Sequence, residues 1–282
     1  MGFDSLPAPD RQFETSFILT DRHRDINRLR FAQAWKHTNA GGQIIMSGPK
    51  TDGIDAFIKE IKSHTDVDGT LPKSHGKVFW LTRTDQDTPA FKEWLTLSDP
   101  RKNADGYFTA AGMFSAAKVD PGSQLLVEQF SDDIKGRVAD LGAGWGYLSA
   151  NLLTRAPKVT ALVLIEADHA ALDAAKLNVT DQRASFHWAD ATTLDGHDNL
   201  YDMVISNPPF HESRKSDPEL GQKFIQKSAR MLKANGRLLL VANRQLPYEK
   251  TLEQVFRSIE NVAGSNGYKI ILAKNPRPVK RR

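Results

Sequence analysis

The feature that most constrains the fold is a pattern repeated through the second half of the chain: a short apolar run, a loop, and a stretch with helical spacing. Short apolar runs rich in β-branched residues predict buried strands, and apolar residues three and four positions apart predict helices that pack on them. Strands that alternate with helices form a mostly parallel sheet covered on both faces. We expect strands at 138–141, 161–165, 185–188, 203–206, 237–241 and 268–273, with helices at 147–153, 170–177, 220–232 and 248–259.

The first part of the chain has the same α/β texture, but no glycine-rich loop follows any of its strands. A polar stretch at 99–107 separates it from the second half, and we interpret this stretch as a linker. We therefore expect a smaller domain over 1–105 and a larger one over 106–282. In the smaller domain the pattern predicts strands at 17–19, 43–46 and 78–81 and helices at 25–37 and 54–61.

The composition is that of a soluble globular protein, with 40% apolar and 26% charged residues. There are no cysteines, which excludes disulfides and thiolate metal sites and fits a reducing cytoplasm. The histidines show no ligand spacing, so we expect no bound metal. We find no signal peptide and no apolar run of membrane-spanning length, and we therefore expect a cytoplasmic protein with no membrane partner.

The net charge of +4 comes from the C-terminal end. Residues 269–282 contain six basic side chains and no acidic ones. Such a segment can contact phosphates, or it can be an ordinary solvated terminus, and we weigh the two interpretations equally. A second basic group, formed by Arg22, Arg24, Arg28 and Arg30, has mixed spacing. For this group we favour an ordinary solvated helix surface over an RNA-binding face.

The loop after the strand at 138–141 is rich in glycine and reads A-D-L-G-A-G-W-G-Y. Gly142, Gly144 and Gly146 let the backbone approach a ligand and turn sharply into a helix N-terminus. A dinucleotide fingerprint needs its third glycine where this chain has Tyr147, which argues against a nicotinamide oxidoreductase. A glycine loop alone can also be no more than a tight turn between a strand and a helix.

Carboxylates occur at the ends of the neighbouring strands. Glu166 ends the next strand, 20 residues after Gly146, where a carboxylate can accept hydrogen bonds from both hydroxyls of a ribose. Asp190 ends the third strand and can accept from an adenine amino group, or it can cap the segment that follows. Asp140 precedes the glycines and can hold their loop or an ammonium group.

The fourth strand ends in the loop S-N-P-P-F-H at 206–211. Two consecutive prolines remove two backbone donors and fix two φ angles, so the strand cannot continue through them. The loop is therefore stiff, and it holds out an amide and an aromatic ring. His211 invites a role as general base, but a histidine beside such a loop is more often a hydrogen-bonding loop residue.

Together, the glycine loop, Glu166 and Asn207-Pro208-Pro209-Phe210 resemble the motifs of class I S-adenosylmethionine-dependent methyltransferases. The last motif matches the (D/N)-P-P-(Y/F/W) pattern of enzymes that methylate planar amino nitrogens: adenine N6, guanine N2 or the glutamine amide. The resemblance implies a Rossmann-like domain with a mostly parallel seven-stranded sheet. It also implies S-adenosylmethionine as cofactor, with the binding residues Asp140, Gly142, Gly144, Gly146, Glu166, Asp190 and Asn207.

The same resemblance places the chemistry on Asn207, Pro208, Pro209 and Phe210. The carboxamide oxygen of Asn207 and the carbonyl of Pro208 can each accept an N–H of the amine and draw its lone pair toward the methyl group. The prolines keep these acceptors preorganised, and Phe210 offers a face on which a base can stack after leaving its helix. Methyl transfer is then an in-line displacement that depends chiefly on positioning.

Over the whole chain the sequence is similar to the bacterial ribosomal RNA guanine-N2 methyltransferases, in the stretches 112–126, 206–211, 236–248 and 265–274. Members have two methyltransferase-like domains, of which the N-terminal one has lost its cofactor loop. The likeness implies methyl transfer to the N2 amine of a guanine in ribosomal RNA, with the 16S RNA of the small ribosomal subunit favoured. The degenerate domain over 1–105 is shorter than usual and is expected to support folding and RNA binding. We favour a monomer.

Two alternatives stay open. One is an adenine-N6 or protein-glutamine methyltransferase, because the N-P-P-F loop by itself indicates only a planar amino nitrogen. The other is a non-catalytic RNA-binding factor of ribosome assembly that has kept the fold. The intact glycine loop, Glu166 and Asn207 argue against this second alternative.

Overall fold

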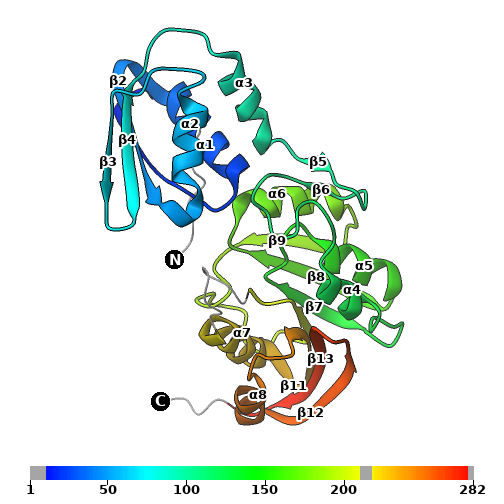
Figure 1. Ribbon diagram of the computed structural model, residues 1–282. Helices are drawn as coiled ribbons and strands as arrows, with labels where there is room; N and C mark the ends of the chain where they lie inside the picture. Colours follow the sequence, from blue (N-terminus) through cyan, green and yellow to red (C-terminus); the bar gives the residue numbers. More distant parts are fainter. Residues whose placement is uncertain (1–10, 210–217, 279–282) are drawn as a thin grey trace. The chain divides into compact units, whose positions relative to one another are not determined.

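The computed structural model describes residues 11–209 and 218–278. Contacts between residues divide the chain into two compact units (Figure 1). Within the described residues, the N-terminal unit consists of Arg11–Pro100 together with Ala110–Gly112. The C-terminal unit consists of Arg101–Thr109 and the chain from Met113 onward. Across the described ranges, no helix is both long and apolar enough to cross a membrane.

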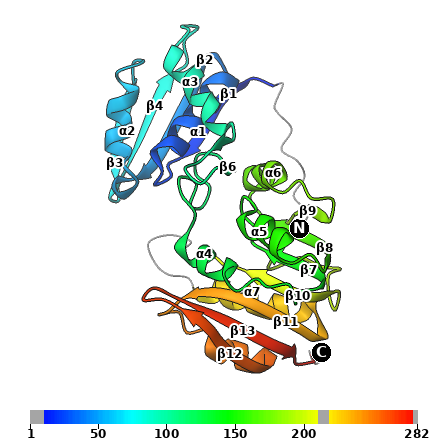
Figure 2. The same ribbon diagram turned by 90° about the vertical axis from the view of Figure 1, so that its right-hand side faces the viewer.

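The C-terminal unit is built on a seven-stranded sheet with the strand order β12-β13-β11-β10-β7-β8-β9 (Figure 2). All neighbouring strands are parallel except for the pairs that β13 forms with β11 and β12. The expected α/β class and mostly parallel sheet are therefore confirmed. The strands are β7 (Gly136–Leu141), β8 (Val159–Glu166), β9 (Ala184–Trp188), β10 (Tyr201–Ser206), β11 (Leu232–Asn243), β12 (Phe256–Gly264) and β13 (Tyr268–Pro276).

Helices cover both faces of this sheet. They are α4 (Pro121–Val127), α5 (Tyr147–Arg155), α6 (His169–Asn178), α7 (Pro218–Met231) and α8 (Glu249–Val255). Val138 and Leu164 belong to a core with residues of α4, α5 and α6, whereas Ala139 and Ile165 belong to a core with residues of α7 and α8. Successive strand residues point to opposite faces, so strands between two helix layers are apolar throughout.

The expected helix over 248–259 is wrong in its last four residues. Helix α8 ends at Val255, and from Phe256 the chain forms β12, which pairs antiparallel with β13. Leu252, Val255, Phe256 and Ile259 have the spacing of a helix face, which explains the error. Because β12 lies at the edge of the sheet and several of its side chains are exposed, it lacks the alternating apolar pattern of a strand. Pairing with β13 decides its conformation.

The N-terminal unit has a four-stranded sheet with the order β1-β2-β4-β3, in which only β1 and β2 are parallel. Its strands are β1 (Phe13–Leu19), β2 (Thr38–Pro49), β3 (Gly69–Lys73) and β4 (Gly76–Thr82), and its helices are α1 (Arg24–His37), α2 (Ile54–Ile61) and α3 (Pro89–Leu95). The sequence pattern did not predict β3 or α3. In the C-terminal unit, β5 (Arg101–Lys102) and β6 (Phe108–Thr109) form a short antiparallel pair, with β5 inside the expected linker and β6 directly after it.

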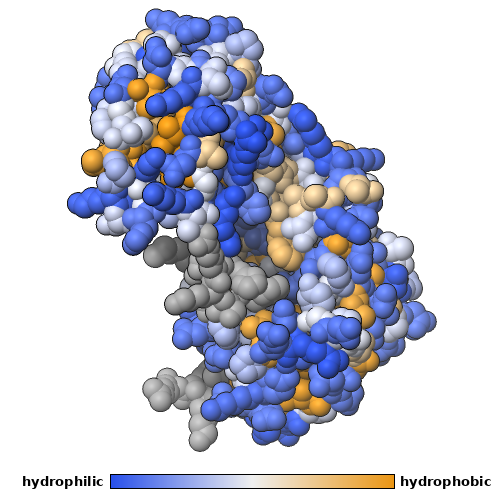
Figure 3. All heavy atoms as spheres, viewed as in Figure 1, coloured by the Kyte–Doolittle hydropathy of each residue, from blue (hydrophilic) through white to orange (hydrophobic). Residues whose placement is uncertain are grey.

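One face of the N-terminal sheet packs on an aromatic core, and the other is partly open. Phe31 lies at the centre of the core, with ring centroids 5.2 Å from Phe91 and 6.4 Å from Trp94. On the open side, Phe17 and Leu19 of β1 are exposed, and Figure 3 shows apolar surface over this sheet. The arginines of α1 make ion pairs: Arg24 and Arg28 with Glu60, and Arg28 also with Asp25. These pairs support the interpretation of an ordinary helix surface.

Candidate functional site

The expected site residues lie at the carboxyl ends of adjacent strands in the C-terminal unit. In the sheet, β7 lies between β8 and β10, so the strand order reverses at β7. Ligands of open α/β sheets bind at such a reversal. The glycine loop follows β7, Glu166 ends β8, and Asn207 follows β10. The fold therefore brings these three parts of the sequence to one edge of the sheet.

The glycines of the loop serve different purposes. Gly142, Gly144 and Gly146 have φ angles of 76°, 54° and 87°, a region that L side chains rarely adopt. A Cβ at Gly144 would meet no atom within 4 Å, whereas a Cβ at Gly146 would lie 3.0 Å from Val179 and 3.2 Å from Ala175. Gly146 thus lets the loop pack against α6. At Gly144 there is free space beside the Cα atom, so a ligand can approach the backbone there.

Glu166 is bonded to the glycine loop. Its Oε2 accepts a hydrogen bond from the Gly144 N–H at 2.8 Å, and its Oε1 accepts one from the Asp168 N–H at 2.8 Å. Burial raises the pKa of this carboxyl group. Each carboxylate oxygen can accept more than one hydrogen bond, so Glu166 can hold the loop and still accept from the hydroxyls of a ligand.

Asp140 is fully buried at the end of β7. Its Oδ2 accepts a hydrogen bond from the Ser149 hydroxyl at 2.7 Å. Its Oδ1 is also buried and has no hydrogen-bond partner among the described residues. Burial raises the pKa of Asp140 to about 7, and the charge of Glu166 adds to this effect. A buried carboxylate is stable only with a compensating partner, so this position suits a positively charged group.

Asp190 follows β9 and is partly buried. Its Oδ1 accepts hydrogen bonds from the N–H of Thr192 at 2.8 Å and from the Thr192 hydroxyl at 2.7 Å. The residue therefore caps the turn that follows, which is one of the two expected roles. The contact with an adenine amino group stays a prediction.

The loop after β10 is tied to the segment that precedes β7. The amide nitrogen of Asn207 donates to Asp120 Oδ2 at 3.1 Å and to Ser123 Oγ at 2.8 Å. The amide oxygen accepts no hydrogen bond from the described part of the chain. Pro209 lies close to the glycine loop, since a Cβ at Gly142 would come within 4.0 Å of its Cδ. Two residues named from the sequence, Phe210 and His211, lie outside the described residues.

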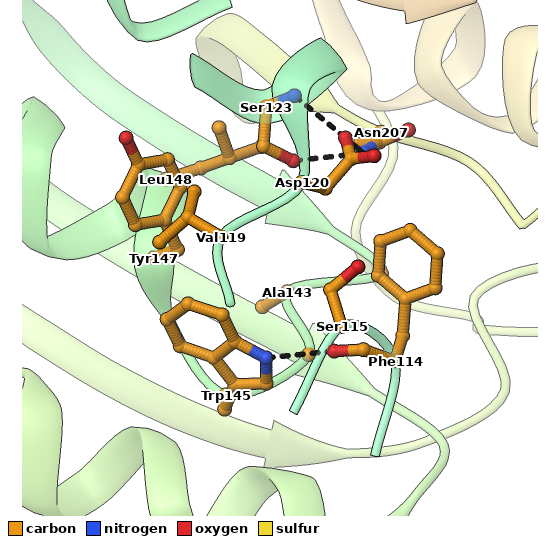
Figure 4. Close-up of a pocket in the computed structure, with 12 residues that line it drawn as sticks. Phe114, Ser115, Val119, Asp120, Ser123, Ala143, Trp145, Tyr147, Leu148 and Asn207 are labelled. Atoms are coloured by element: carbon orange, nitrogen blue, oxygen red, sulfur yellow. Dashed lines mark hydrogen bonds between the residues drawn. The ribbon is translucent and has the colours of Figure 1, made fainter. Parts of the chain in front are cut away.

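A cavity lies beside the glycine loop (Figure 4). Of the seven expected cofactor-binding residues, Gly142, Gly144 and Asn207 line this cavity, whereas Asp140, Gly146, Glu166 and Asp190 are not among its lining residues. Sequence reasoning assigned no site role to most of the other lining residues, among them Phe114, Asp120, Ser123, Trp145 and Tyr147. The only signal for the first three was the family-like stretch 112–126, in which the D-P-G-S sequence reads simply as a helix start.

An exposed aromatic ring stands at this cavity. Phe114 is 59% exposed, and its carbonyl oxygen accepts a hydrogen bond from Trp145 Nε1 at 2.8 Å. The next residue, Ser115, has a φ of 50°. Backbone in this region is strained for a residue other than glycine and persists where the surroundings hold it. Over 11–209 and 218–278, no cluster of His, Asp or Glu side chains could hold a metal ion.

Comparisons with known proteins agree with this architecture. Residues 106–272 match the methyltransferase small domain family. A ribosomal RNA small subunit methyltransferase C from Shewanella loihica is 30% identical over 272 residues, covering 94% of this chain and 78% of the relative. One from Psychromonas ingrahamii is 26% identical over 266 residues, covering 93% and 76%.

Among solved structures, the T. thermophilus 16S rRNA N2 methyltransferase RsmC, in complex with AdoMet and guanosine, has the same fold with a TM-score of 0.76. It is 23% identical, and the match covers 94% of this chain and 73% of that one. The resemblance noted in the motifs is confirmed by the family match and by the relatives that share most of the chain. The protein belongs to the methyltransferase small domain family, and within it to the ribosomal RNA small subunit methyltransferase C group.

Proposed function

We propose that this protein transfers a methyl group from S-adenosylmethionine to the exocyclic N2 amine of a guanine in 16S ribosomal RNA. The observation that carries the proposal is the orientation of the Asn207 amide. Its nitrogen is held by Asp120 and Ser123, so its oxygen is left to accept from a substrate amine beside the glycine loop. The guanine and the small subunit rest on the names of the relatives and of the structural neighbour.

The described residues fit this cofactor. S-adenosylmethionine carries a sulfonium and an ammonium group, and Asp140 offers a buried carboxylate oxygen without a partner among the described residues. The free space beside Gly144 lets the cofactor approach the backbone. Glu166 can accept hydrogen bonds from its ribose hydroxyls, and Asp190 accepts one from its adenine amine. When bound, the cofactor supplies a methyl group on a positively charged sulfur, which is a good leaving group.

The residues of the chain act on the amine rather than on the methyl group. The amide oxygen of Asn207 and the carbonyl of Pro208 accept its two N–H bonds and hold the nitrogen lone pair in line for displacement. Pro208 and Pro209 restrict the loop, so the two acceptors do not reorganise during the reaction. Holding two reactants in line accounts for a large part of such rate enhancements.

Aromatic rings hold the base. Stacking on an aromatic side chain is worth about 1–3 kcal/mol per base and is how single-stranded bases are usually gripped. Phe114, exposed at the cavity, supports this role, and Phe210 has the same role by the family motif. A base can reach these rings only after it leaves its helix.

The remaining assignments follow from the same proposal. The segment 106–282 is the catalytic domain, and 1–105 is a degenerate methyltransferase-like domain that supports folding and RNA binding. The enzyme works in the cytoplasm as a monomer on ribosomal RNA or the small subunit, without a metal ion.

The test is methyl transfer from radiolabelled S-adenosylmethionine to small ribosomal subunits or naked 16S RNA that lack the modification. We expect label in N2-methylguanosine, and Asn207→Ala should reduce the rate about 10²- to 10³-fold because one preorganised acceptor is lost. Thermal unfolding of the variant, followed by circular dichroism, controls for folding. Label in N6-methyladenosine or in protein glutamine, or no transfer by the wild-type enzyme, would contradict the proposal.

A further inference from the structure

The two ends of an amide differ in chemistry, so the orientation of the Asn207 side chain decides what it can do. With the oxygen toward the substrate it accepts from an amine, and with the nitrogen toward the substrate it repels one. Both hydrogens of the Asn207 NH₂ group are used within the chain, on Asp120 Oδ2 at 3.1 Å and on Ser123 Oγ at 2.8 Å. The opposite orientation would set the amide oxygen against a carboxylate.

Asp120 is itself held by contacts from two other elements. As the N-cap of α4, its Oδ2 accepts from the Ser123 N–H at 2.7 Å. Its Oδ1 accepts from the hydroxyl of Tyr268, the first residue of β13, at 3.2 Å. Asp120 is 7% exposed. A Cβ at Gly122 would come within 2.7 Å of the Tyr268 ring. Contacts from α4 and β13 therefore hold the Asp120 side chain in place independently of its contact with Asn207.

We propose that Asp120, with Ser123, is the positioning pair that fixes the orientation of the Asn207 amide, and that this pair requires Asn rather than Asp at position 207. The inference rests on the proposed function and deepens it. The family motif admits either residue at this position. Here the partner is Asp120, whose oxygens already accept from the Ser123 N–H, the Asn207 amide and the Tyr268 hydroxyl. A carboxylate at 207 would face that of Asp120, and two such groups at hydrogen-bond distance share a proton.

The first experiment is the pH profile of kcat for Asn207→Asp with saturating cofactor and guanine substrate. We expect the ratio of its kcat to the wild-type kcat to fall at least tenfold between pH 6 and pH 9, because the shared proton is lost. Asp120→Asn/Asn207→Asp, which leaves one carboxylate, should lose this dependence. Tyr268 of β13 is the titratable group in described contact with Asp120. Asp140 of β7 also titrates in this range, but it is present in every protein compared, so its effect cancels in the comparison with the wild type. A profile for Asn207→Asp parallel to that of the wild type would overturn the inference.

The second experiment compares two changes at Asp120. Asparagine keeps an acceptor for Ser123 and Asn207, and its nitrogen can donate to the Tyr268 oxygen, whereas alanine removes the acceptor. We expect kcat within about threefold of wild type for Asp120→Asn and at least about tenfold lower for Asp120→Ala, with similar KM for RNA. Equal kcat for the two variants would overturn the positioning role. Failure of the wild-type enzyme to methylate guanine would instead overturn the proposed function, so the two failures are distinguishable.

Discussion

Two carboxyl groups, the partly buried Glu60 and the fully buried Asp140, illustrate how the two units of this chain differ. In the N-terminal unit, burial alone would raise the pKa of Glu60, but hydrogen bonds and charges from Arg24 and Arg28 outweigh it and lower the pKa. In the C-terminal unit, Asp140 has only the Ser149 hydroxyl as a described partner, and burial raises its pKa to about 7. A carboxylate with its own cations stabilises a fold. One without them is costly in the folded chain, and the cost is removed when a ligand brings the positive charge.

The largest expected effect is on cofactor affinity, which should depend on Asp140 and not on Glu60. Asp140→Asn should weaken S-adenosylmethionine binding about 100-fold, because the buried counter-charge is lost. Removing one partner of a desolvated charge pair typically costs 2–5 kcal/mol. Glu60→Gln is the matched change in the other unit and should leave the affinity unchanged. Calorimetric titration of both variants checks this, and equal affinities for Asp140→Asn and wild type would break the comparison.

The next effect is on how the free energy of unfolding of the cofactor-free protein depends on pH. The pKa of Asp140 is about 7 in the folded chain against 3.8 as its ordinary value, so the folded state binds a proton more tightly and loses stability as pH rises between these values. We expect the contribution of Asp140 to fall by about 2–3 kcal/mol from pH 5 to pH 8.

Urea unfolding of wild type and Asp140→Asn at both pH values measures this contribution, because the difference between the two proteins cancels the titration of histidines and other groups. If the stability difference between the two proteins is the same at pH 5 and pH 8, the carboxyl group does not have the raised pKa.

The smallest effect belongs to the paired carboxylate. The pKa of Glu60 is lowered in the folded chain, so its contribution is present above its ordinary pKa and is lost as pH falls through the folded value. Because Arg24 is 67% exposed, solvent screens the interaction, and Glu60→Gln should cost only about 1 kcal/mol at pH 7. Unfolding experiments at pH 7 and pH 3.5 check it, with a smaller difference expected at the lower pH.

The main strands of the C-terminal sheet and three of the residues lining its cavity were predictable from the sequence. Buried strands between two helix layers need continuous apolar runs, and the ends of these runs revealed the glycine loop, Glu166 and Asn207. Edge elements were not predictable in the same way. Strand β12 has exposed side chains and helical spacing of its apolar residues, and only hydrogen bonding to β13 decides its conformation.

Which atoms these residues present to a ligand was decided by the tertiary structure alone. Gly142, Gly144, Glu166 and Asn207 could be named from the chain because strand ends in a parallel sheet meet at one edge. The orientation of the Asn207 amide depends on Asp120 and Tyr268, which are 87 and 61 positions away in the sequence. Hydrogen bonds between such distant residues leave no periodic pattern in the sequence. The sequence by itself thus determined where the site lies, and the packing of α4 and β13 determined which way its amide faces.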